Sequence, residues 1–179
     1  REEAGRFSRG FFIAGLGATQ FALPGGLDLL RPLKDSGEHP ETVDMAATDP
    51  ANPYGAALKW AGGKDGRGPT RTVGATVVLF DGSLVAYLAR GDRDLLTWLP
   101  EAEPQRSQAA RAIASRLIER ARSGGETPRG MLIEEIDGAP PALHFVAPFL
   151  AEAGFLSGAL GFQSTRPPNL TSLATEPRI

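Results

Sequence analysis

The sequence contains no cysteine, which excludes disulfide bonds, thiolate catalysis and zinc sites built on cysteine. Its two histidines, His39 and His144, lie far apart and outside any pattern of ligand spacing, so no metal site is predicted. Basic residues (19) do not outnumber acidic ones (21), so no overall positive field attracts nucleic acid. No apolar run approaches the roughly 20 residues that cross a bilayer, so no membrane partner is predicted. A chain without cysteine fits a reducing, cytoplasmic location.

Glycine and proline are abundant instead, with 22 and 15 residues, which favours short elements joined by many turns. Hydrophobic residues make up 41% of the 179 positions, enough for one buried core. The chain starts without methionine and ends in a polar stretch that contains several prolines, which suggests a piece of a longer polypeptide. We expect one domain over residues 1–165 and a disordered tail over 166–179.

Two local patterns predict well-defined elements. Asp81-Gly82 lies between two β-rich runs and predicts a hairpin with a type I′ turn. One apolar stripe predicts a long amphipathic helix over 104–124. The stripe consists of Ala110, Ile113, Ala114, Leu117, Ile118 and Ala121.

Weaker patterns predict the remaining elements. They are two strands within 5–23, a short helix within 24–35, strands at 91–100, 129–138 and 155–162, and a helix over 141–154. Pro148 kinks this last helix or marks its first turn, and its apolar face is predicted as Leu143, Val146, Phe149, Leu150 and Ala153. The predicted fold class is α+β: a mainly antiparallel sheet with flanking helices in a single compact domain.

No pattern predicts a catalytic residue. The glycines form no phosphate-binding G-x-x-x-x-G-K-[ST] loop, and the serines lack a nucleophile-elbow context. Glu134 and Glu135 are adjacent on a predicted strand, so they point to opposite faces and cannot form an acid–base pair.

Basic residues next to aromatic ones are the candidate nucleic-acid contacts. Arginine and tryptophan in a glycine-rich loop can stack on and neutralise a single strand, or they can anchor one domain on another. The predicted contacts are Arg6, Arg9, Lys59, Trp60, Lys64 and Arg71. The arginines of the long helix are interpreted as a solvated face, with a phosphate-tracking surface as the alternative.

The stretch "MAATDPANPYGAALKW", residues 45–60, has an unusual density of turn residues. Pro50 and Pro53 fix their φ angles, and Asp49 and Asn52 can form Asx-turns. A rigid loop that presents Tyr54 and Trp60 is therefore predicted. An interdomain or loop-stiffening role is assigned to Asp49, Pro50, Asn52, Pro53 and Tyr54.

"AATDPANPYGAAL" also resembles a signature of the Lhr family, the large helicase-related proteins of bacteria and archaea. "GRFSRGFFIAGLGATQFALPGGLDLLR" is similar to the family's stretch that follows its winged-helix region. "GATVVLFDGSLVAYLARGDRDLLTW" and "MLIEEIDGAPPALHFVAPFLAEAGF" are similar to a hairpin and to a strand, turn and helix of the family core. The resemblance covers roughly residues 5–162. It departs at "ALKWAGG", where the family usually has "ALPWP".

The resemblance implies an accessory C-terminal domain of a superfamily 2 helicase core. Such proteins use ATP and Mg²⁺, bound by their motor domains, to move 3′ to 5′ on single-stranded DNA, unwind duplexes including RNA:DNA hybrids, and act in DNA repair. The resemblance implies no cofactor in this chain. The implied partners are upstream winged-helix and RecA-like domains of the same polypeptide and a single strand of DNA or an RNA:DNA hybrid.

Two other function classes stay open. The first is a protein-interaction scaffold that does not touch nucleic acid. The second is a DNA-modifying domain of glycosylase type, which needs a carboxylate in a pocket beside DNA. Asp49 and Glu135 are the candidates for that carboxylate.

Overall fold

A computed structural model describes residues 7–13, 16–17, 19–32, 40–62, 68–123 and 130–164. Several residues of interest, among them Arg6, His39 and Lys64, lie outside these ranges, as does the predicted tail over 166–179.

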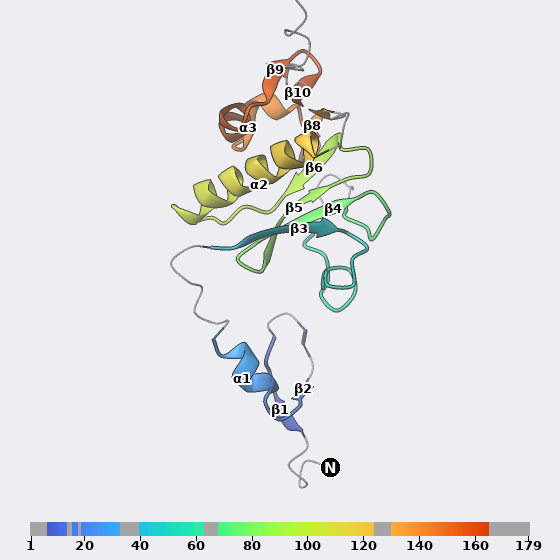
Figure 1. The fold of residues 1–179 in the computed structure, drawn as a ribbon, viewed down its shortest axis with the longest axis vertical. Coiled ribbons are helices and arrows are strands. Elements are labelled where there is room, and N and C mark those ends of the chain that lie inside the picture. Colours follow the sequence, from blue (N-terminus) through green and yellow to red (C-terminus); the bar gives the residue numbers. More distant parts are fainter. Residues whose placement is uncertain are drawn as a thin grey trace, which may run out of the picture.

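The centre of the fold is a five-stranded sheet with the order β3-β4-β5-β6-β8 (Figure 1). Its strands are β3 (Thr42–Ala46), β4 (Thr76–Phe80), β5 (Ser83–Leu88), β6 (Asp94–Thr97) and β8 (Glu135–Ile136). All neighbours pair antiparallel except β6 and β8, which are parallel. Asp81 and Gly82 have φ angles of 49° and 74°, as the type I′ turn of the predicted β4–β5 hairpin requires.

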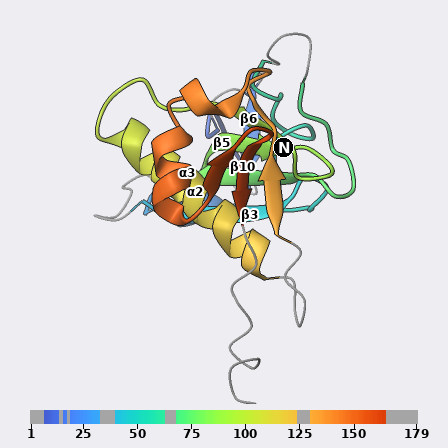
Figure 2. The ribbon, with the colours of Figure 1, turned by 90° about the horizontal axis from the view of Figure 1, so that it is seen from above.

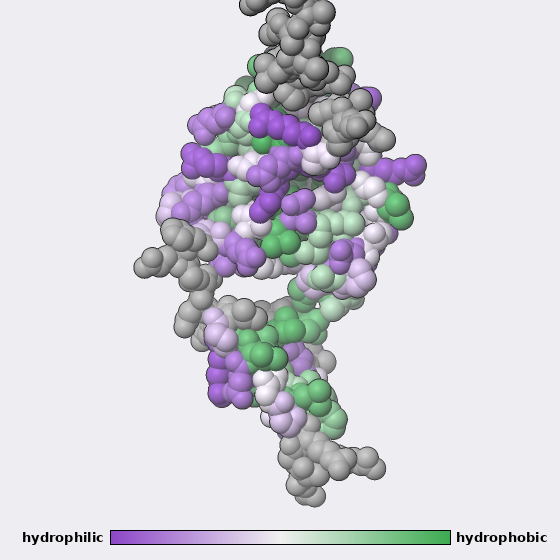
Figure 3. Space-filling model, in the orientation of Figure 1, coloured by the Kyte–Doolittle hydropathy of each residue, from purple (hydrophilic) through white to green (hydrophobic). Residues whose placement is uncertain are grey.

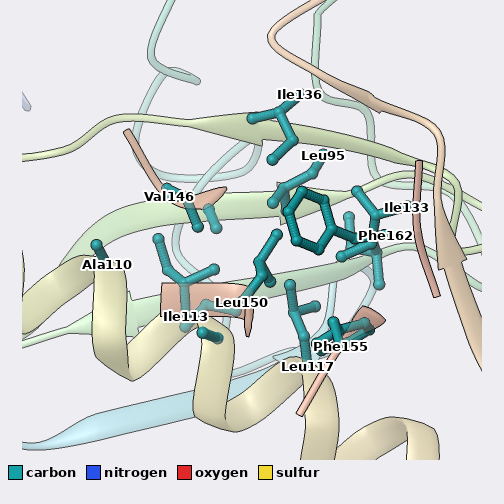
Figure 4. Packing of buried hydrophobic residues seen from close by; sticks show 14 of the residues in the cluster. Leu95, Ala110, Ile113, Leu117, Ile133, Ile136, Val146, Leu150, Phe155 and Phe162 are labelled. Atoms are coloured by element: carbon teal, nitrogen blue, oxygen red, sulfur yellow. The ribbon is translucent and has the colours of Figure 1, made fainter. Parts of the chain in front are cut away.

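The main core lies where the long helix α2 (Gln105–Arg122) packs on one face of this sheet. The predicted apolar stripe of α2 is buried at every position. On the other side of α2 lie α3 (Ala147–Ala153) and a three-stranded sheet of β7 (Met131–Ile133), β10 (Gly161–Ser164) and β9 (Leu156–Gly158) (Figures 1 and 2). Figure 4 shows Leu95 of β6, Ile113 of α2 and Leu150 of α3 converging in one cluster.

The segment after α2 differs from its predicted elements. The helix predicted over 141–154 is divided into a 3₁₀ turn at Pro141–Leu143 and α3, because Pro148 fits only the first turn of a helix. Leu143 is 99% exposed, so its assignment to the buried face is wrong. The strand predicted at 129–138 is two strands in different sheets, and the one at 155–162 is the β9–β10 hairpin.

The N-terminal residues form a small hairpin of β1 (Ser8–Gly10) and β2 (Gln20–Ala22), followed by the short helix α1 (Gly26–Leu30). The Gln20 side chain ties the hairpin by accepting the backbone N–H groups of Phe12 and Ile13 at 2.9 and 2.8 Å. This part exposes large apolar side chains, including Phe11 at 77% and Leu29 at 74%, and Figure 3 shows much of its surface as hydrophobic. Figure 1 shows it apart from the five-stranded sheet.

The elements confirm the α+β class with mainly antiparallel sheets and flanking helices. Among the described residues, no helix combines the length and the apolar character that a membrane crossing needs.

Candidate nucleic-acid interface

The loop over residues 47–62 lies on the face of the sheet opposite α2, where it completes a second hydrophobic cluster. The Tyr54 and Trp60 rings stack with centroids 6.3 Å apart, and Trp60 meets the Tyr87 ring edge-on at 5.8 Å. The Tyr54 hydroxyl accepts the backbone N–H of Leu84 at 3.1 Å. The two aromatic residues of the loop therefore pack against their own sheet.

Arg71 ties this loop together from outside it. Its Nη1 donates to the carbonyls of Asn52 and Tyr54 at 2.8 and 3.1 Å, and its Nη2 donates to those of Thr48 and Asp49 at 3.3 and 3.0 Å. A planar guanidinium carries donors in the fork geometry that such a set of acceptors needs. The four carbonyls engage both terminal nitrogens of Arg71.

Local side-chain bonds stiffen the same loop. Asp49 Oδ1 accepts the N–H of Ala51 at 2.8 Å, and Asn52 Oδ1 accepts the N–H of Tyr54 at 3.0 Å, which are the two predicted Asx-turns. The buried Asn52 amide also donates to the Ala47 carbonyl at 2.8 Å. Gly55, at φ 75°, lies so close under the Trp60 ring that a Cβ there would come within 2.3 Å of Nε1. The interdomain or loop-stiffening role of Asp49, Pro50, Asn52, Pro53 and Tyr54 stays a prediction, with which these contacts are consistent.

The structure separates the predicted nucleic-acid contacts into different settings. Trp60 is half-buried in the second cluster, and Arg71 is bonded to the loop. Lys59, which directly precedes Trp60, is exposed. Arg9 is exposed on β1, paired in register with Phe21, and Arg6 and Lys64 lie outside the described residues. Nucleic-acid binding by these residues stays a prediction, which Lys59 and Arg9 suit by exposure.

The arginines of α2 are mostly engaged in ion pairs. Arg111 lies 3.5 Å from Glu152, and Arg120 lies 3.3 Å from Asp92. Arg116 pairs with Glu119 at 3.1 Å and donates to the Thr42 carbonyl of edge strand β3 at 2.7 Å. This pairing favours the interpretation of a solvated, charge-balanced face over a phosphate-tracking surface.

A cavity of about 310 Å³ lies at the carboxyl ends of the parallel strands β6 and β8, beside the first turn of α2. Parallel strands bring their carboxyl ends to one edge of a sheet, and ligands of α/β proteins often bind there. The lining residues are Thr97, Leu99, Pro100, Glu101, Arg106, Asp137, His144 and Phe145.

Asp137 is an acidic residue of this lining that is bonded to the end of β6. Its Oδ1 accepts the Thr97 N–H at 2.7 Å, and its Oδ2 accepts the Thr97 hydroxyl at 2.9 Å. His144 Nδ1 accepts the Val146 N–H at 3.2 Å, and its Nε2 lies 3.2 Å from Asp137 Oδ2. In the described part of the chain, no group of three or more His, Asp or Glu side chains is arranged to hold a metal ion.

Arg106 and Phe145 form one wall of the cavity. The Arg106 guanidinium carbon lies 4.0 Å from the centre of the Phe145 ring, within the range of a cation–π interaction. Further along α2, Arg111 lies over Phe149 at 5.4 Å, and the two phenylalanine rings are 5.6 Å apart. Arginine and phenylalanine therefore alternate along the junction of α2 and α3.

A comparison with protein families indicates the class of protein to which the chain is similar. The family model described as "Large helicase-related protein, winged-helix domain" matches residues 1–42. The β1–β2 hairpin and α1 thus lie within a match to a winged-helix domain. The expectation that residues 5–31 follow the winged-helix region is therefore wrong, because the match includes them in that domain. The prediction of one domain over 1–165 stays a prediction.

Two curated relatives then give the family. The chain is 45% identical over 141 residues to the "Lhr helicase/probable uracil glycosylase" of Mycolicibacterium smegmatis, covering 76% of this chain and 9% of the relative. It is 33% identical over 163 residues to the "Lhr helicase/uracil glycosylase" of Escherichia coli, covering 89% of this chain and 10% of the relative. The chain belongs to the Lhr family of large helicase-related proteins and spans about a tenth of the length of these relatives.

Sequence reasoning did not find the cavity. No pattern predicts a role for Asp137, Arg106 belongs to the helix arginines interpreted as a solvated face, and His144 lies outside any pattern of ligand spacing. The available signal was the Asp-Gly turn directly after a short strand, because such an aspartate lies at a strand end and can accept bonds from a neighbouring strand. Nothing local indicated that Thr97 was that neighbour.

Proposed function

We propose that this chain is an accessory region of an ATP-dependent helicase of superfamily 2. The observation that supports it best is the match to a winged-helix domain over 1–42 together with relatives whose names contain "Lhr helicase". In this proposal the α+β unit buttresses the winged-helix and motor domains and contacts single-stranded DNA. The whole protein would move 3′ to 5′, unwind DNA or RNA:DNA hybrids in DNA repair in the cytoplasm, and bind ATP and Mg²⁺ in its motor domains.

Two features of this chain favour a buttress. The 47–62 loop is held by its own hydrogen bonds and by Arg71, so it offers a surface of defined shape, unlike a flexible linker. The N-terminal hairpin and α1 expose Phe11, Phe21 and Leu29, and an exposed apolar group of this kind is typical of a surface that packs on another protein segment. The second feature also suits the scaffold alternative, in which no nucleic acid is bound.

We expect the 179-residue chain to hydrolyse no ATP, with or without DNA, and to bind a labelled single-stranded oligonucleotide weakly and only at low salt. Lys59→Ala should weaken binding about two- to threefold, because one exposed cation contributes one phosphate contact. Fluorescence anisotropy measures the binding of the oligonucleotide, and a phosphate-release assay measures the hydrolysis of ATP.

DNA-stimulated turnover would contradict the proposal that the chain has no motor function. No binding at low salt, with tight association to the winged-helix and motor domains, would favour the scaffold alternative.

A second candidate is base excision, because the names of both relatives include uracil glycosylase. Of the carboxylates considered from the sequence, Asp49 is bonded to Ala51 within an Asx-turn, and Glu135 is half-buried in β8. The test is release of uracil from a single-stranded oligonucleotide by the purified chain. Release that Glu135→Gln or Asp49→Asn abolishes would establish this candidate, and release by neither wild type nor variants would remove it for this segment.

A further inference from the structure

We propose that the cavity at the carboxyl ends of β6 and β8 binds one nucleotide of single-stranded nucleic acid, with Arg106, held over Phe145, as the surface on which the base stacks. This inference rests on the proposed function, since it names the place where the strand would contact this domain. It assigns a role to residues that neither the motifs nor the relatives' names single out.

Arg106 is an unusual cation for its position. It is the second residue of α2, and the amino end of a helix disfavours positive charge. The first turn of α2 contains no acidic residue, and the Glu103 carboxylate accepts the Ser107 N–H at 3.2 Å. Within the described ranges, Arg106 forms no salt bridge. Its guanidinium therefore packs on the Phe145 ring without a carboxylate in ion-pair contact.

The cavity has the size and chemistry for a single nucleotide. Its volume of about 310 Å³ is at the lower end of the range for small-ligand sites, about 300–1,000 Å³. Nucleobases stack on arginine planes and on aromatic rings, and a guanidinium can also pair with a backbone phosphate. Arg106 provides the guanidinium plane and Phe145 the aromatic ring, and both residues line the same cavity.

The acidic groups of the cavity decide which part of the nucleotide enters it. The exposed Glu101 and the more buried Asp137 both line it, and they repel a phosphate. The same carboxylates can accept hydrogen bonds from amino groups on a base edge. We therefore place the base inside the cavity and the phosphate outside it, within reach of Arg106.

The test measures binding of a fluorescein-labelled, mixed-sequence oligonucleotide to the 179-residue chain across a salt series. Arg106→Ala should weaken binding about tenfold, because it removes one stacked base and one phosphate contact. The slope of log K against log salt should fall by about 0.7, the value for one phosphate on a single strand. Arg106→Lys should keep the slope but recover only part of the affinity, because lysine cannot stack.

Arg111→Ala is the matched control. Arg111 lies on the same helix and over a phenylalanine ring, but Glu152 compensates its charge. We expect a change of about twofold or less. A 5-iodouracil oligonucleotide should also crosslink to the peptide that contains Phe145.

Each outcome decides the inference. Wild-type binding that Arg106→Ala leaves unchanged, or crosslinks confined to other peptides, would overturn the nucleotide site and leave the proposed function standing. Wild-type chain that binds no oligonucleotide at low salt would overturn both.

Discussion

Replacing Arg71 with alanine is expected to lower the free energy of unfolding by about 3 kcal/mol. The substitution removes hydrogen bonds to four carbonyls of the 47–62 loop, and bonds to a charged partner are worth about 1.5–3 kcal/mol each when buried. Arg71 is only half-buried, so water replaces part of this loss. Urea unfolding followed by tryptophan fluorescence measures the change, since Trp60 packs in the cluster that the loop covers.

Two companion variants separate geometry from charge. Arg71→Lys keeps the charge but loses the fork, so it should recover less than half of the lost stability. Arg90→Ala removes the same side-chain type from an exposed position and should change stability by about 0.5 kcal/mol or less. Equal losses for Arg71→Ala and Arg90→Ala would show that the bonds to the loop contribute nothing.

Replacing Gly161 with alanine is expected to lower the free energy of unfolding by about 4 kcal/mol. Gly161 has a φ of 127°, which side-chain-bearing residues rarely adopt, and a Cβ there would lie 2.0 Å from the Ile133 carbonyl oxygen. That oxygen belongs to the backbone of β7, the strand paired with β10, so it cannot move without breaking the ladder. The melting temperature followed by circular dichroism measures the loss.

Gly82→Ala is the control for backbone conformation alone. Gly82 has a φ of 74°, and a Cβ at this position would have no other atom within 4 Å. We expect a loss of about 1–2 kcal/mol from the left-handed conformation. A Gly161→Ala variant that is no less stable than Gly82→Ala would mean that β7 and β10 separate easily.

The sequence predicted the elements whose signals are local. Asp81-Gly82 specifies its own turn, and the apolar stripe of α2 specifies both a helix and its buried face. The two Asx-Pro steps likewise predicted the two Asx-turns of the loop, because these turns act within a few residues.

What the sequence did not predict depends on distant contacts. β3 is an edge strand whose exposure does not alternate, so it has no period of two to detect. Arg71 contacts carbonyls 17–23 residues away, and Thr97 meets Asp137 across 40 residues. Tertiary packing also sets the surroundings of Trp60, because its ring lies against Tyr87, which is 27 residues away in the sequence.

The parallel pairing of β6 with β8 has a consequence for the order of folding. Strands β3 to β6 follow one another in sequence and pair with their neighbours, whereas β8 joins only after the chain has passed through α2. Closing this longer loop costs more chain entropy, so β8 should dock after the meander has formed. Pulse-labelling hydrogen exchange should find the Thr97 N–H protected later than the amides of β4 and β5. The residues that line the cavity would then come together only in the completed fold. A ligand bound there would therefore stabilise the contacts between β6 and β8, which form last.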